Sequence, residues 1–124
     1  MLGIFGKKGQ ARQIIRDTKA IIRSDESAYT DRHLGKITAL TDKHLERAKT
    51  EISSGADPGK VPRWLRETHR TARKGSDQAG LSSATLAIIF LKAKKLGDVA
   101  QPACDAIEAF LARWPKIPDE ESGS

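Results

Sequence analysis

Basic side chains recur at helical spacing between residues 60 and 74, and their chemistry is the binding of anions. Arginine guanidinium groups form paired hydrogen bonds to phosphate or carboxylate oxygens, and several such contacts give a strong, salt-dependent attraction. On a helical projection the four arginines lie within about 80° of one another, so one flat acidic surface can meet them all. The predicted anion-binding residues here are Lys60, Arg63, Arg66, Arg70, Arg73 and Lys74. The alternative is an ordinary solvated face of a bundle helix.

A second basic stripe lies on a segment predicted to be helical from Ala11 to Arg23. Its apolar side chains, led by Ile14, Ile15 and Ile22, share an arc of about 120°. The basic residues opposite are also predicted to bind the anionic partner, and they are Arg12, Arg16, Lys19 and Arg23. With the apolar tip at residues 2–5, this pattern is typical of a helix lying in a membrane interface, or of a docking arm. The same isoleucines can instead pack onto the rest of the protein.

One stretch of the sequence resembles a known family. Residues 69–81 read His-Arg-Thr-Ala-Arg-Lys-Gly-Ser-Asp-Gln-Ala-Gly-Leu. This is similar to the active helix and following turn of histidine phosphotransfer domains, where a phosphorylatable His is followed by Lys-Gly-Ser and a Gly-Leu turn. The resemblance implies a four-helix bundle over residues 34–114, with His69 as phosphoacceptor beside Arg73 and Lys74. Matching the Lys-Gly-Ser instead places Thr71 at the His position and implies a degenerate module.

No other group of residues predicts a metal, a cofactor or a catalytic centre. His33 and His44 fall on one side of their helix but about 16 Å apart along it, and no His or Cys pair has metal-ligand spacing. Nor is there a glycine-rich phosphate loop with a Lys-Ser or Lys-Thr ending. Cys104 is expected to pack as a small apolar residue. The sequence therefore predicts a non-enzymatic protein without cofactors.

The element expected to organise the fold is the apolar segment from Ala84 to Leu96. Its apolar side chains point almost all the way round a helix, so other helices must surround it. Ser83 is the predicted N-cap, and Gly97 the predicted end. At about 20 Å this helix is too short for the roughly 30 Å hydrocarbon core of a bilayer. The predicted core residues are Ala84, Leu86, Ile88, Ile89, Phe90 and Leu91.

Helical periodicity predicts three further helices. One runs from Asp31 to about Gly55, and the next begins near Pro62, a residue tolerated in a first helical turn. The polar stretch at residues 24–30 is expected to include a turn, and residues 75–80 are expected to form a loop.

The last helix has two candidate starts. It begins with a capping box from Asp98 to Gln101, or at Pro102, and Pro115 closes it. Its predicted apolar face consists of Val99, Ala103, Ala106, Ile107, Phe110 and Trp114.

These elements predict an all-α protein, because no segment alternates with the period of a strand. We expect a small antiparallel bundle of four core helices plus the N-terminal amphipathic helix, in a single domain. Within residues 1–124 we expect a basic arm or helix at 1–30, the bundle at 31–114 and a flexible acidic tail at 115–124.

Overall charge favours anionic partners. The formal net charge is +6, and residues 1–23 and 60–74 each carry six basic side chains and one acidic one. An acidic protein surface is the preferred partner, with an anionic membrane or nucleic acid as alternatives. The single cysteine and the lack of a signal-peptide pattern predict a cytoplasmic location, with peripheral membrane attachment as the alternative. Oligomeric state does not follow from the sequence.

Overall fold

The computed structural model describes residues 6–116, and within this range all of the regular secondary structure is helical. The all-α prediction is confirmed. The predicted apolar tip at residues 2–5 and the acidic part of the tail lie outside the described residues. In chain order the elements are α1 (Lys7–Ala28), α2 (Asp31–Ser53), α3 (Arg63–Lys74), α4 (Gln78–Leu96), the short 3-10 helix η2 (Asp98–Ala100) and α5 (Gln101–Arg113).

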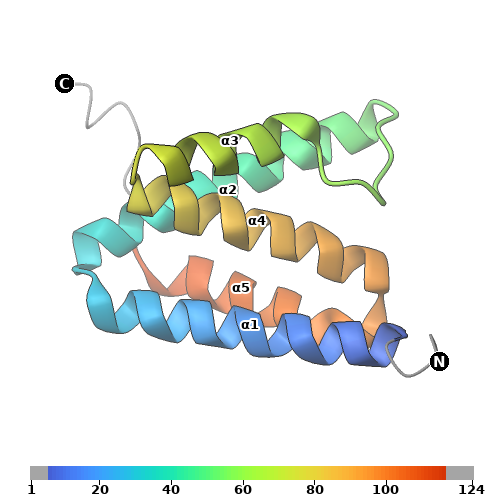
Figure 1. Cartoon of the computed structure of the whole chain (residues 1–124), viewed down its shortest axis with the longest axis horizontal. Coiled ribbons are helices and arrows are strands. Elements are labelled where there is room, and N and C mark those ends of the chain that lie inside the picture. Colours follow the sequence, from blue (N-terminus) through green and yellow to red (C-terminus); the bar gives the residue numbers. More distant parts are fainter. Residues whose placement is uncertain (1–5, 117–124) are drawn as a thin grey trace.

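The central helix of the molecule is α4, as its all-round apolar character predicts. It packs against α1, α2, α3 and α5. Figure 1 shows α2 and α3 on one side of α4, and α1 and α5 on the other. Its side chains Leu86 and Phe90 are buried, whereas Ile88 and Ile89 are only half-buried. The sequence therefore identified the central helix correctly, but two of its predicted core residues are incompletely covered.

Helix α1 packs along α4, α5 and η2. Ala11, Thr18 and Ile22 are buried, so its apolar face is covered by the protein itself. The turn expected within residues 24–30 is found at Tyr29 and Thr30, which separate α1 from α2. Helix α1 extends further into this polar stretch than the predicted end at Arg23, and Asp25 within it is buried.

The start of α4 also differs from the prediction. The helix begins at Gln78, and the Asp77 side chain accepts a hydrogen bond from the Gly80 backbone N–H, so Asp77 and not Ser83 is the N-cap. Ser83 lies inside the helix, where it is fully buried and donates to the Gly80 carbonyl. The connection from α3 is accordingly only residues 75–77. At the other end, Gly97 adopts a φ of 88°, which ends α4 as predicted.

Proline residues mark the starts of α3 and α5, as the sequence predicts. Pro62 directly precedes α3, and Pro102 lies in the first turn of α5. The N-cap position of α5 is Ala100, without a side-chain capping bond, and Asp98 lies in η2, so the capping-box alternative is wrong. Val99 was predicted to be on the buried face but is 40% exposed, because residues 98–100 form a separate 3-10 turn with a different register.

Candidate binding groove between α3 and α4

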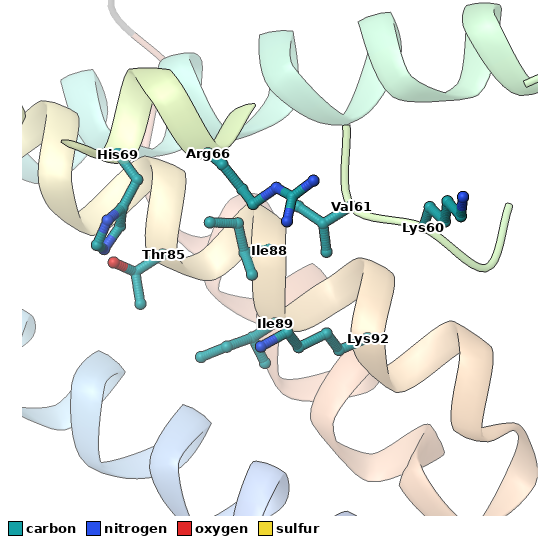
Figure 2. A pocket seen from close by; sticks show the side chains of 8 residues that line it. All are labelled: Lys60, Val61, Arg66, His69, Thr85, Ile88, Ile89 and Lys92. Atoms are coloured by element: carbon teal, nitrogen blue, oxygen red, sulfur yellow. The ribbon is translucent and has the colours of Figure 1, made fainter. Parts of the chain in front are cut away.

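A groove of about 650 Å³ runs between α3 and α4. Figure 2 shows the side chains that line it, from the residues before α3 at one end to His69 at the other. They are Lys60, Val61, Arg66, His69, Thr85, Ile88, Ile89 and Lys92.

One face of α4 forms the floor of this groove. Thr85, Ile88, Ile89 and Lys92 are spaced as i, i+3, i+4 and i+7, which places them on one side of the helix. Val61 adds an apolar side chain from the segment before α3. The two isoleucines and Val61 are half-buried and pack against the core with only part of their surface. The middle of the floor is therefore apolar and open on the groove side, with Thr85 at one end of the α4 face and Lys92 at the other.

Cationic side chains border this apolar floor. Lys60, Arg66 and Lys92 are exposed, and none of the residues that line the groove is acidic. Within residues 6–116, none of these three cations forms a salt bridge, whereas the neighbouring Arg63 pairs with Glu67 at 3.3 Å. The groove consequently combines apolar surface with uncompensated positive charge.

The predicted anion-binding residues between positions 60 and 74 are all exposed but do not all lie at the groove. Lys60 and Arg66 line it. Arg63, Arg66 and Arg70 surround a smaller depression with Glu67 on the outer side of α3. Arg73 and Lys74 occupy the last helical turn, where the helix dipole favours cations.

The basic stripe of α1 lies apart from that of α3. Its members are exposed: Arg12, Arg16, Lys19 and Arg23. Because α1 and α3 lie on opposite sides of α4 (Figure 1), the two stripes belong to different regions of the surface. The buried Ile22 and the half-buried Ile14 and Ile15 already serve packing, which leaves little apolar surface on α1 for a membrane.

His69, the residue singled out by the phosphotransfer resemblance, is half-buried in α3. Figure 2 shows its ring facing Thr85 at one end of the groove. Arg73 and Lys74 are exposed at the end of the same helix. Thr71 lines a different depression, between α2 and α3.

Aromatic and polar side chains elsewhere are engaged in structural contacts. The Trp64 indole N–H donates to Glu51 Oε1 at 2.7 Å, and the Arg47 guanidinium lies 4.1 Å from the centre of that ring. The Trp114 indole N–H donates to Glu26, which also pairs with Arg113. These tryptophans hold neighbouring elements together.

The histidines and the cysteine of the described range show no metal-site arrangement. No three His, Cys, Asp or Glu side chains between residues 6 and 116 converge as metal ligands would. The His33 ring stacks against Tyr29 at 4.2 Å, and the His44 ring faces Trp64 at 5.9 Å. Cys104 is 1% exposed, and burial raises the pKa of its thiol, which leaves it poorly suited to act as a nucleophile.

Sequence reasoning found the rim of the groove at Lys60, Arg66 and His69 but missed its floor. Thr85, Ile88, Ile89 and Lys92 have the spacing of one helix face. On a helix that is apolar all round, however, this spacing does not distinguish an open face from a covered one.

Comparisons with protein-family models, curated proteins and solved structures give no match to this chain. No helix within residues 6–116 has both the length and the apolar character needed to cross a bilayer.

Proposed function

We propose that the protein is a non-enzymatic helical interaction module that binds an acidic protein surface through α3 and the adjoining groove. The observation that carries this proposal is the grouping of Lys60, Arg66 and Lys92 around an apolar floor that has no acidic residue in its lining. An acidic partner compensates these charges, and an apolar side chain of that partner covers the floor.

A protein partner explains this site better than nucleic acid or a membrane does. Binding of single-stranded nucleic acid relies on exposed aromatic rings for base stacking. The Trp64 ring is instead engaged within the protein, through its hydrogen bond to Glu51 and the guanidinium of Arg47 over its face. Membrane binding relies on a broad apolar face, whereas the isoleucines of the groove lie between two helices. For the scaffold we keep the interpretation of four antiparallel core helices with α1 beside them. The short connections on either side of α4, at residues 75–77 and at Gly97, support it. The cytoplasmic location stays a prediction.

A charge-reversal experiment with matched variants tests the proposal. Arg66→Glu with Arg70→Glu changes α3, and Arg16→Glu with Lys19→Glu makes the same change of charge on α1. Polyglutamate, duplex DNA and acidic vesicles are the probes, at low salt. We expect the α3 variant to bind polyglutamate at least about tenfold more weakly and with a shallower salt dependence. The α1 variant should bind nearly as the unaltered protein does.

Two results would contradict this assignment. Equal losses in both variants would mean that net charge, and not α3, controls binding. Duplex DNA or vesicles bound through α3 more tightly than polyglutamate would assign the surface to one of those partners. Both variants change exposed residues, so their thermal stability should stay close to that of the unaltered protein.

Phosphotransfer through His69 is the second candidate function. The placement of the imidazole in an open groove beside a cationic rim favours it. In that reaction an imidazole nitrogen attacks the phosphorus of a donor such as phosphoramidate, the donor N–P bond breaks and ammonia leaves. Phosphohistidine that forms in the unaltered protein and not in His69→Gln supports this function. A degenerate module shows no such label.

A further inference from the structure

We propose that the α3–α4 groove takes an amphipathic helix of the acidic partner, with apolar anchors on Val61, Ile88 and Ile89 and carboxylates toward Lys60, Arg66 and Lys92. This inference rests on the proposed function and specifies the form of the partner segment. Three observations support it: the spacing of the residues that form the floor, the partial exposure of its two isoleucines, and the placement of the cations.

The floor has the dimensions of two helical turns. Thr85 and Lys92 are seven residues apart on α4, which corresponds to about 10.5 Å along the helix axis. A helix lying in the groove repeats the same distance between its own positions i and i+7. Apolar residues at i, i+3 or i+4, and i+7 of the partner therefore meet the floor in succession, which is the usual manner of helix-in-groove recognition.

The half-buried isoleucines indicate a site that residues 6–116 leave unfilled. Ile88 and Ile89 lie on the central helix, whose neighbouring residues Leu86, Ala87 and Phe90 are buried. Four helices pack against α4 and still leave this one face open. An additional helix in the groove would complete the cover.

The cations indicate that the partner segment is negatively charged and where its carboxylates lie. Lys60 and Arg66 come from the α3 side of the groove and Lys92 from α4 (Figure 2). An occupant of the groove therefore meets cations from the α3 side and from α4. A helix with one apolar stripe bordered by Glu or Asp on each side matches this arrangement, and a like-charged helix is repelled by it. A flat bilayer surface would meet the cationic rim before it reached the floor.

Two peptides of identical composition test the form of the partner. The first places Leu at i, i+3 and i+7 with Glu on both flanks of that stripe, and the second contains the same residues in an order without an apolar face. We expect the amphipathic peptide to bind at least about tenfold more tightly and to become helical on binding. Polyglutamate measures the electrostatic part alone.

Variants of the floor and a matched control locate the binding. Ile88→Asp should weaken the binding of the amphipathic peptide at least about tenfold. Val99→Asp makes a similar change at an exposed apolar residue outside the groove and should leave binding unchanged. If Ile88→Asp fails to fold, Lys92→Glu at the exposed rim supplies the same comparison. Ile88→Asp should retain part of its polyglutamate binding through Arg66 and Arg70.

The outcomes separate this inference from the proposed function. Equal binding of the two peptides, unchanged by Ile88→Asp and Lys92→Glu, overturns the helix-in-groove inference while leaving the basic surface of α3 as the binding site. No binding of either peptide or of polyglutamate at low salt overturns both. Vesicle binding that is lost in Ile88→Asp, without peptide binding, assigns the groove to a membrane and likewise overturns the inference.

Discussion

The Trp64 indole N–H donates a 2.7 Å hydrogen bond to Glu51 Oε1, which joins the beginning of α3 to the end of α2. Arg47, also on α2, covers the same ring and lies 3.3 Å from the second carboxylate oxygen of Glu51. These contacts hold α3 from its α2 side. The opposite side of α3, with Arg66 and His69, borders the groove.

Replacing Trp64 with Phe tests the strength of this attachment. The variant keeps a large ring but removes the N–H donor, so one oxygen of the partly buried Glu51 loses its partner. We expect the free energy of unfolding to fall by about 1–2 kcal/mol, as measured by urea denaturation. Binding of polyglutamate should hardly change, because Trp64 does not line the groove. An unaltered stability would show that Arg47 alone holds Glu51 in place.

A pair of substitutions in α4 distinguishes its core from the floor of the groove. Leu86 is fully buried, so Leu86→Ala should lower the free energy of unfolding by about 2–5 kcal/mol through the cavity it leaves. Ile88 is only half-buried, and Ile88→Ala should cost clearly less, about 1 kcal/mol. Thermal and urea denaturation give both values. Equal losses would mean that the groove is closed in solution.

Asp25 predicts an unusual dependence of stability on pH. Its side chain is on α1, the residue is 7% exposed, and Oδ2 has no hydrogen-bond partner within the described part of the chain. Burial raises the pKa of this carboxyl, and a hydrogen bond with Ser82 and the proximity of His33 act in the opposite direction. A raised folded-state pKa means that the contribution of Asp25 to stability is complete below the unfolded pKa and is lost as the pH rises through the folded pKa.

Asp25→Asn removes this titration. We therefore expect the variant to be more stable than the unaltered protein at neutral pH. The difference should shrink as the pH falls through the raised folded-state pKa, and it should level off below about 4, the ordinary pKa of aspartate. Urea denaturation over a pH series measures this. The control is Asp17→Asn, at an exposed position of the same helix, which should change little. A variant less stable than the unaltered protein at every pH would instead show that the charged carboxylate is needed where it lies.

The sequence predicted the helices better than their surfaces, and particular residues show why. The all-round apolar character of Ala84–Leu96 was sufficient to identify the central helix, and Pro62, Pro102 and Gly97 marked where helices begin or end. Local signals of this kind depend on residues that are close in the chain. They give the position of a helix but not the arrangement of its neighbours.

Features that depend on tertiary packing could not be predicted in this way. Asp25 lies in a stretch that is polar in sequence, and its burial depends on the helices that pack around it. The sequence of the stretch alone therefore gives no sign of this burial. The open face at Ile88 and Ile89 exists because α3 and the helices around it leave that side of α4 uncovered. Hydrophobicity shows which side chains favour burial. The position of the α3–α4 groove, however, depends on how all five helices pack together.

Gly80 gives a last test, of the junction between α3 and α4. In a helix interior, replacing Gly with Ala usually stabilises a protein by about 1 kcal/mol. Here a Cβ at residue 80 would lie 2.4 Å from Asp77 Oδ2 and 3.2 Å from the Ala72 Cβ on α3. Gly80→Ala must therefore displace the capping carboxylate of Asp77, and Ala72 must move by a few tenths of an ångström. We expect it to destabilise the protein by about 1–3 kcal/mol, a reversal of the usual sign.

A double-mutant cycle with Asp77 identifies the cause of this loss. Asp77→Ala removes the N-cap, which should cost about 1 kcal/mol by itself. In that background the shortest contact is gone, so adding Gly80→Ala should cost clearly less than it does alone, and the two losses should not add. Additive losses would place the conflict at Ala72 instead of at the cap. A Gly80→Ala protein more stable than the original would show that the junction relaxes freely, and that this glycine is not required for the close approach of α3 to α4.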